Sequence, residues 1–393
     1  AGMKRTFPLL CAVGFFGLLA YEWCRTPMTP WFARSFQIDE SFVGFIMGAS
    51  TMTGILLKLP GGILSDVWGR KPILVAALLF ITATPFAYIL VDGPIGLLLV
   101  RFLHGGATSL FMPVTIAIIA DIFPQRKGTA MGWYWAFALS GRSIGHTLSP
   151  TVLLATGSFA TTYMIAGPIG GIGLLLALAI KSPKKKPPQR KKVSFRTGFL
   201  QTIKNKRILF AALAGGSLWF ATGSIQANLP LYATEVRGIG EVKVGTLFTT
   251  LVLVSLICRP LMGMLSDRIG RKPIIVSGLL LTGTLIIFIM RTESYHTLLI
   301  LVAGYGLAEA MVQTCTTAFV ADICKQDSLG TALGAFGMLM DIGHASGLAL
   351  TGTLLVFLDG NYNSTFLIVG MLVLLSAVIF LFFVRAPLPQ DSA

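Results

Sequence analysis

The sequence predicts an all-α membrane protein with twelve transmembrane helices in two pseudo-symmetric six-helix bundles. The 393-residue chain is 54% hydrophobic and only 12% charged, whereas a soluble domain is about a quarter charged. Apolar runs of about twenty residues, the length that crosses a bilayer, recur along it. A loop also recurs after half the chain, because residues 62–73 read GILSDVWGRKPI and residues 263–274 read GMLSDRIGRKPI.

The first six spans precede the middle of the chain. They are expected near residues 7–33, 41–66, 72–91, 94–123, 128–155 and 160–180. The first run is too long and too polar in its middle for a cleavable signal peptide. Pro27 and Pro30 are expected to loosen its end, because proline lacks the amide that a helix needs.

A basic, proline-rich stretch follows, with the sequence KSPKKKPPQRKK from residue 181. Such a stretch can form neither a core nor a span. Six more spans are expected near residues 208–235, 243–267, 273–290, 296–324, 330–357 and 364–385. We therefore predict an N-terminal bundle (1–180), a basic cytoplasmic linker (181–206) and a C-terminal bundle (207–393).

The net charge of +15 reflects topology and does not indicate a nucleic-acid partner. With both termini inside, most of the 31 lysines and arginines fall in cytoplasmic segments, and only Arg34, Arg237, Lys243 and Arg291 fall outside. This asymmetry is the positive-inside rule. We expect a multi-pass protein of the inner (cytoplasmic) or plasma membrane, with both termini cytoplasmic. The five cysteines have no pairing or metal-ligand spacing, so no metal is expected.

The two halves match beyond the repeated loop. Ala120-Asp121-Ile122 matches Ala321-Asp322-Ile323 at the same offset of 201 as the loop, and Lys58 occupies the position of Arg259. Residues 128–132 match residues 330–334 as well. An even number of spans per half gives parallel repeats, related by an axis along the membrane normal.

These residues resemble the major facilitator superfamily over essentially the whole chain. The doubled Gly-x-x-x-Asp-x-x-Gly-Arg-Lys loop is that family's most specific signature, and Arg101 to Gly106 resembles its fourth-helix motif in proton-coupled members. Residues 229–232 (LPLY) resemble the twelve-helix drug:proton antiporter branch. The fifth-helix antiporter motif departs from the pattern, because His146 replaces its proline, and the first loop has Val67 in place of a basic residue. The resemblance implies a central cavity between two bundles, rocker-switch alternating access and a monomer.

The repeated loops are expected to act as a gate. Asp66 and Asp267 can meet the positive end of a neighbouring helix. Basic residues beside them can pair with Asp121 or Asp322, namely Arg70, Lys71, Arg271 and Lys272. The alternative is that these are solvated charges that serve topology alone. The predicted gating residues are Gly62, Asp66, Gly69, Arg70, Lys71 and Asp121 in the first half and Gly263, Asp267, Arg268, Gly270, Arg271, Lys272 and Asp322 in the second.

Charged residues inside the spans indicate a polar cavity. They are Glu22, Arg25, Lys58, Arg101, Arg142, Arg259, Glu309 and Asp341. Each would cost about 2.5–3.5 kcal/mol near the bilayer centre on insertion scales. Three acids cannot neutralise five bases, so the surplus needs water, a helix C-terminus or an anion. Glu22 and Arg25 lie three residues apart, on one helix face where they can pair.

Particular roles follow from the resemblance, which places spans one, four, seven and ten around the cavity. Glu22 is the first candidate for protonation, with Arg101 as its partner and Asp341 as a further coupling residue. A permanent ion pair between spans one and four is the alternative. Arg142 and Arg259 have no acid on their side of the predicted interface, which predicts a negative group on the substrate; snorkelling of Lys58 and Arg259 is the alternative. The predicted substrate cavity comprises Glu22, Arg25, Lys58, Arg142, His146, Gln226, Arg259, Glu309, Gln313, Asp341 and His344.

The sequence contains no catalytic constellation and no phosphate-binding loop, so we expect neither an enzyme nor a cofactor beyond the proton gradient. The leading hypothesis is a secondary active transporter that exports a small anionic or amphipathic compound in exchange for protons. The alternatives are an anion:proton symporter or a lysolipid-type translocator. A non-transporting membrane receptor or scaffold is a hypothesis of a different class.

Overall fold

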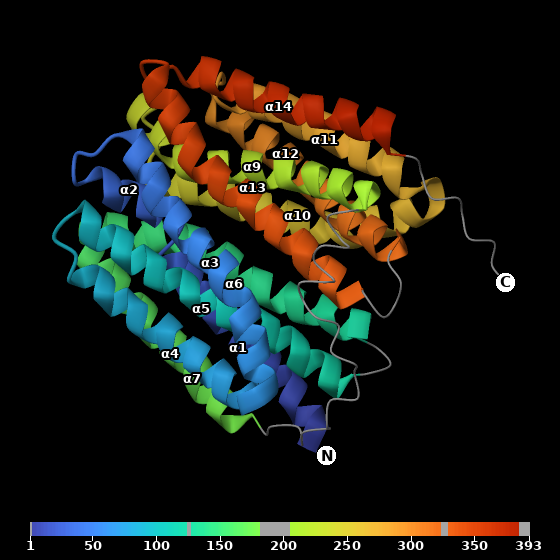
Figure 1. Ribbon diagram of the computed structural model, residues 1–393. Helices are drawn as coiled ribbons and strands as arrows, with labels where there is room; N and C mark the ends of the chain where they lie inside the picture. Colours follow the sequence, from blue (N-terminus) through green and yellow to red (C-terminus); the bar gives the residue numbers. More distant parts are fainter. Residues whose placement is uncertain (1, 124–126, 181–204, 324–328, 385–393) are drawn as a thin grey trace. The chain divides into compact units, whose positions relative to one another are not determined.

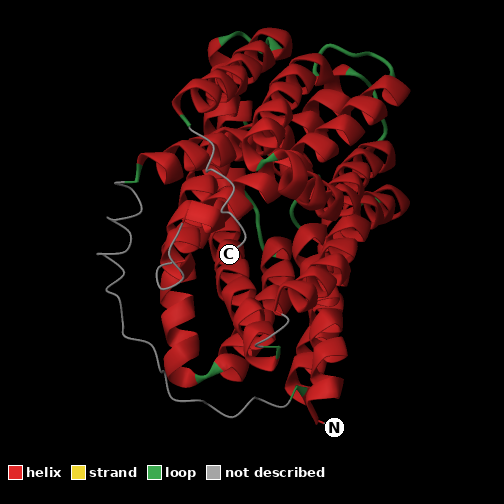
Figure 2. Ribbon diagram, turned by 90° about the vertical axis from the view of Figure 1, so that its right-hand side faces the viewer, coloured by secondary structure: helices red, strands yellow, loops and turns green. Residues whose placement is uncertain are grey.

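The structure is a computed structural model that describes residues 2–123, 127–180, 205–323 and 329–384 (Figure 1). All the regular structure in these ranges is helical, with short connecting loops (Figure 2). The predicted linker lies almost entirely outside the described residues. The side chains at Lys58, Gly62 and Asp66 are likewise outside them.

The first half of the chain contains seven described helices. They are α1 (Gly2–Trp23), α2 (Met28–Arg34), α3 (Glu40–Trp68), α4 (Arg70–Ile89), α5 (Pro94–Ile122), α6 (Lys127–Thr156) and α7 (Phe159–Ala179). The first predicted span is thus two helices. The break immediately precedes Met28, at Pro27, where a helical amide is missing.

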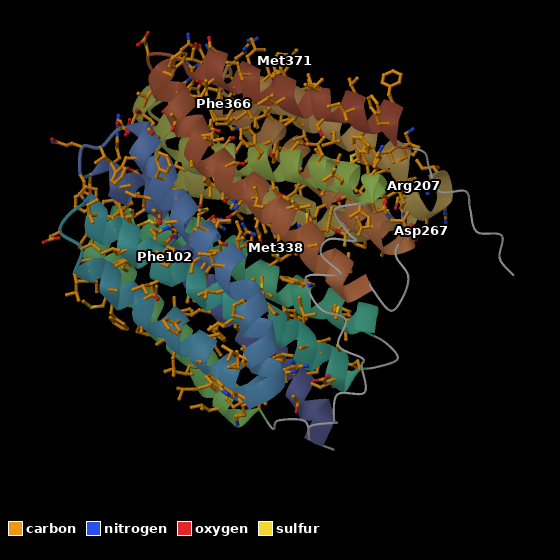
Figure 3. The ribbon with its side chains drawn as sticks, in the orientation of Figure 1. Phe102, Arg207, Asp267, Met338, Phe366 and Met371 are labelled. Carbon is orange, nitrogen blue, oxygen red and sulfur yellow. The ribbon has the colours of Figure 1, made fainter. Side chains whose placement is uncertain are left out.

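The second half repeats this series. It contains α9 (Lys206–Leu231), the π-helical turn η1 (Tyr232–Val236), α10 (Glu241–Ile269), α11 (Arg271–Ile289), α12 (Tyr295–Ile323), α13 (Leu329–Phe357) and α14 (Tyr362–Phe383). A described helix therefore coincides with each of the twelve predicted spans. Figure 3 shows their side chains, with Phe102, Phe366 and Met371 among those labelled. Phe102 on α5 and Met371 on α14 are about half exposed, whereas Phe366 on α14 is fully buried. Apolar exposure of this kind is expected of helices that face lipid.

Eleven helical segments of the described chain are long and apolar enough to cross a membrane. Helix α6 is the predicted span that does not meet this standard. Its middle carries Arg142, His146 and several hydroxyl residues, which lower its hydropathy. Arg142 and His146 also belong to the polar site described below.

The chain forms two compact units. Unit 1 comprises residues 1–187 and 226–249, and unit 2 comprises residues 188–225 and 250–393. Within unit 1, α1 packs against α6 and α7, α3 against α5, and α4 against α5 and α7. Leucine, isoleucine, valine and phenylalanine side chains of α1, α4 and α5 form its core. Within unit 2, α11 packs against α12 and α14.

The sequence repeat is also a repeat of close helix contacts. A Cβ on Gly105 would overlap the carbonyl oxygen of Ser50, and a Cβ on Gly306 would come within 2.5 Å of that of Leu251. Both members of the second contact lie 201 residues after those of the first. Glycine is needed at these positions because the backbones of two helices meet there.

Candidate functional site

The centre of the candidate site is the carboxylate of Glu22 on α1, which is almost fully buried. Its Oε1 atom lies 3.2 Å from Nη1 of Arg25 and 3.2 Å from Nε of Arg142 on α6. Its Oε2 atom lies 3.5 Å from Nε2 of His146, a contact that becomes an ion pair when the imidazole is protonated. One acid thus serves two guanidinium groups, and the three groups together carry a net positive charge.

Small residues bring the helices of this cluster together. Gly141 and Gly145 on α6 face the carbonyl oxygens of Phe15 and Leu19 on α1, and neither site has room for a Cβ in ordinary van der Waals contact. This close approach of the two backbones places Arg142 and His146 beside Glu22. The predicted pairing of Glu22 with Arg25 is confirmed, and Arg142 is an additional partner.

Arg25 also contacts a residue from the second half of the sequence. Its Nη2 atom donates a hydrogen bond of 3.1 Å to Oε1 of Gln226, at the end of α9 that belongs to unit 1. The two residues are 201 positions apart, so they are equivalents in the repeat. The structure therefore brings together five predicted site residues in unit 1: Glu22, Arg25, Arg142, His146 and Gln226.

Arg101 on α5 lies in a different cluster. It is fully buried, and it donates hydrogen bonds to the Ser50 hydroxyl (2.7 Å), the Met47 carbonyl (3.2 Å) and the Tyr88 hydroxyl (3.4 Å). The Tyr88 hydroxyl is also 3.0 Å from Nδ1 of His104. The structure thus does not join Arg101 to Glu22. Sequence reasoning missed Ser50 and Tyr88, because the spacing along one helix does not reveal partners on other helices.

Unit 2 has its own buried acid. Oε1 of Glu309 on α12 accepts from Nη2 of Arg259 at 3.1 Å and from the Ser255 hydroxyl at 3.0 Å, both on α10. The expectation that Arg142 and Arg259 lack an acid is therefore wrong. Each arginine reaches an acid of its own unit, Arg142 through Glu22 and Arg259 through Glu309. The Glu22 cluster itself keeps a surplus of one positive charge, and the buried Arg101 adds a second cation to unit 1.

Unit 2 also contains a group of polar and aromatic residues around Trp219. The Trp219 indole donates a hydrogen bond of 2.7 Å to Oε1 of Gln313, and its ring meets that of His344 edge-on at 5.4 Å. His344 is buried, and Asp341, one turn earlier on α13, is half-buried. From the sequence we also expect Asp341 to pair with Lys58, whose side chain lies outside the described residues.

The two repeated loops have the same local structure. Arg70 donates to Asp121 at 3.3 Å and to the Ser65 hydroxyl at 2.7 Å. In the second loop, Arg271 donates to Asp322 at 3.1 Å and to the Ser266 hydroxyl at 2.6 Å, and it also pairs with Asp267. The predicted pairings of Arg70 and Arg271 are thus confirmed. The two serines were missed as partners, although their recurrence in both loops was visible in the sequence.

Each loop turns on a glycine in a conformation that side chains disfavour. Gly69 has a φ of 100° and Gly270 a φ of 96°. Lys71 follows the first glycine and donates to the carbonyl of Leu178, in the last turn of α7. In the second loop, Lys272 is half-buried and Arg268 is exposed, while Gly263 lies within α10.

These loop pairs join neighbouring helices of a single unit. Arg70 and Asp121 belong to unit 1, and Arg271 and Asp322 belong to unit 2. The described pairs therefore brace the loop against its own unit. Among the described residues, no group of three or more His, Cys, Asp or Glu side chains could hold a metal ion.

Comparisons with known proteins agree with this architecture. A family profile described as the Major Facilitator Superfamily matches residues 11–249 and 238–393. The chain is 25% identical to an uncharacterized MFS-type transporter of Methanocaldococcus jannaschii, covering 89% of each protein. It is 23% identical to Multidrug resistance protein 1 of Bacillus subtilis, covering 86% of each. The crystal structure of a mutant of the nucleoside transporter NupG superposes with a TM-score of 0.80 at 16% identity, covering 97% of this chain and all of that one.

Proposed function

Because the chain belongs to the major facilitator superfamily, we propose that it is a proton-coupled secondary active transporter of a small compound with a negative group. Membership makes it a membrane transporter and not an enzyme. The energy source would be the proton gradient, and the mechanism would be alternating access. The observation that carries the proposal is the Glu22 cluster of unit 1.

The arginines of this cluster can pair either with the ionised Glu22 carboxylate or, once Glu22 is protonated, with an anionic substrate. With Glu22 ionised, one carboxylate balances part of the charge of Arg25 and Arg142. A proton on Glu22 would remove that balance and leave two cations in a poorly hydrated site. An anionic substrate would then restore it, because arginine pairs well with carboxylate and phosphate groups. The Arg142 side chain is 20% exposed and offers the route of contact.

This arrangement favours cotransport over exchange for an anion. A proton on Glu22 strengthens anion binding at the arginines, and by linkage a bound anion strengthens proton binding. Two ligands that favour each other occupy the same state of the carrier and cross together. Exchange requires the opposite, namely a substrate that competes with the proton for Glu22.

Proton-driven efflux of an amphipathic compound is the second candidate. It is one form of the leading hypothesis from the sequence, which was export of a small anionic or amphipathic compound in exchange for protons. One relative that the chain resembles over 86% of its length is named a multidrug resistance protein. In unit 2, Trp219, Gln313 and His344 combine aromatic surface with hydrogen-bonding groups. Such a group can pack against a flat or amphipathic molecule.

Proteoliposomes with a pH-sensitive dye inside separate the two candidates. Small carboxylates, phosphates and amphipathic cations would be added outside at equal pH, and the internal pH followed. Cotransport of an anion with a proton acidifies the lumen as the anion enters, whereas exchange makes it more alkaline. Glu22→Gln should abolish the pH change, and Asp92→Asn, which neutralises an exposed loop acid, should retain it. A proton-coupled signal that survives Glu22→Gln would contradict the proposed site.

The remaining predictions from the sequence stand as part of this proposal. The halves would be two six-helix bundles (1–180 and 207–393) joined by a cytoplasmic linker, with both termini inside. The protein would act as a monomer in an inner or plasma membrane. The loops around Gly69 and Gly270 would set the rate of alternating access by fixing the ends of the helices that they join. A receptor or scaffold would show no flux in the same assay.

A further inference from the structure

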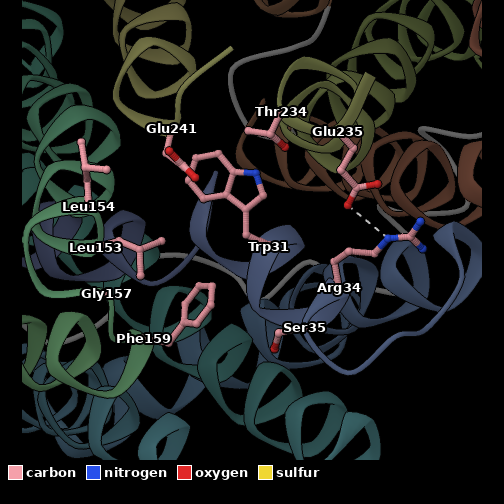
Figure 4. Close-up of a pocket in the computed structure, with 10 residues that line it drawn as sticks. All are labelled: Trp31, Arg34, Ser35, Leu153, Leu154, Gly157, Phe159, Thr234, Glu235 and Glu241. Atoms are coloured by element: carbon pink, nitrogen blue, oxygen red, sulfur yellow. Dashed lines mark hydrogen bonds and ion pairs between the residues drawn. The ribbon is translucent and has the colours of Figure 1, made fainter. Parts of the chain in front are cut away.

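Unit 1 contains a cavity whose lining shares no residue with the Glu22 cluster. It has a volume of about 460 Å³ and is open on one side. It lies between α2, the turn from α6 to α7, and the segment from η1 to the start of α10 (Figure 4). Its lining includes Trp31, Arg34, Leu154, Phe159, Glu235 and Glu241. Ligand pockets commonly have volumes of about 300–1,000 Å³.

One wall of this cavity is aromatic and apolar. The Trp31 indole is held in place because its N–H donates to the carbonyl of Pro230 at 3.3 Å. This hydrogen bond occupies the polar atom of the indole, so the ring contributes apolar surface to the cavity lining. Phe159, Leu153 and Leu154 complete this wall. Such a wall accepts the apolar body of a small molecule.

The charged lining residues give the cavity a negative excess. Arg34 forms ion pairs with Glu40 and Glu235, each at 3.1 Å. It also donates a hydrogen bond to the carbonyl of Ile38. Glu241 has no ion pair or hydrogen bond through its carboxylate with any described residue, although its repeat equivalent Glu40 is paired. Figure 4 shows the Glu241 side chain directed toward the indole of Trp31. A half-buried carboxylate without a counter-ion among the described residues thus lines the same cavity as the Trp31 ring.

We propose that this cavity binds an organic cation. The cationic group, an ammonium or a guanidinium, lies between the Glu241 carboxylate and the Trp31 ring, where ion pairing and the cation–π interaction act together. The apolar part of the ligand packs on Phe159 and Leu154. This ligand differs in sign from the substrate of the Glu22 cluster, so the cavity is a second site of a different chemical class.

Calorimetric titration of the purified full chain with benzyltrimethylammonium tests the proposal. Benzyl alcohol is the neutral control ligand. We expect binding of the cation and a loss of affinity of about tenfold in Glu241→Gln, a factor that corresponds to ~1.4 kcal/mol. The matched control is Asp92→Asn, which removes an exposed acid from the loop between α4 and α5 and should bind as the parent does.

A further variant keeps this test independent of the proposed transport function. Glu22→Gln should lose proton coupling and retain the affinity for benzyltrimethylammonium. The proposal is overturned if the parent protein does not bind the cation, if benzyl alcohol binds as tightly, or if Glu241→Gln and Asp92→Asn have equal affinities. A loss of cation affinity in Glu22→Gln of the size expected for Glu241→Gln would also overturn it, because it would move binding to the Glu22 cluster.

Discussion

Neutralising Glu22 should destabilise the protein, and removing one of its arginines as well should restore part of the loss. Each guanidinium lies 3.2 Å from the carboxylate. At an effective dielectric constant of about 20, that separation gives an attraction of about 5 kcal/mol per pair before desolvation. Glu22→Gln leaves Arg25 and Arg142 buried or half-buried without their counter-ion. A change of this kind costs about 3–5 kcal/mol.

The double variant Glu22→Gln/Arg142→Gln distinguishes the electrostatic explanation from simple loss of packing. Removing Arg142 from the Glu22→Gln background eliminates one uncompensated cation, so the double variant should be more stable than Glu22→Gln alone. Partners in one ion-pair network couple by about 0.5–3 kcal/mol, and we expect the upper part of that range. The assay is reversible unfolding in mixed detergent micelles, followed by tryptophan fluorescence. Free energies that add within about 0.5 kcal/mol would refute the reasoning.

Three further predictions concern the repeated elements. Arg271→Gln removes a partly exposed ion-pair network, so transport in proteoliposomes should fall by less than about tenfold while expression persists; an unchanged rate would exclude a role in gating. Gly105→Ala places a methyl group against the carbonyl of Ser50 and should lower the free energy of unfolding by about 1–3 kcal/mol. The control is Gly132→Ala, which should not lower it, because a Cβ at that position meets nothing within 4 Å. Gly270→Ala forces alanine to a φ of 96° and should lower the unfolding midpoint; an equal or higher midpoint would contradict the strain.

The fold was largely predictable because its signals are local. A run of about twenty apolar residues is sufficient to indicate a membrane helix. The break between α1 and α2 was indicated by a local signal too, because the missing amide of Pro27 removes a hydrogen bond within one helical turn. The repeated loop also predicted the contacts of Arg70 and Arg271 with their aspartates, because equivalent residues recur at equal spacing in both halves.

The charged clusters were predicted less well because they depend on which helices touch. Spacing along α1 indicated that Glu22 and Arg25 share a face, but nothing in one helix identified Arg142 as a third member. The signal was present in Gly141 and Gly145, whose spacing of four marks a face that another backbone can approach. Arg101 was assigned to Glu22 from a family resemblance, and its hydrogen bonds to α3 and α4 could not be read from that motif.

The pairing of Arg34 with Glu235 has a consequence for how such a chain can arise. The two residues occupy the same position in the two repeats, as Arg25 and Gln226 do. An assembly of two unlinked, identical halves would offer only arginine against arginine or glutamate against glutamate there. Once the two copies are joined in one chain, each can mutate independently. Two like charges at equivalent positions can then be replaced by an attractive pair such as Arg34 and Glu235. The duplicated gene thus gains contacts that no symmetric dimer could make.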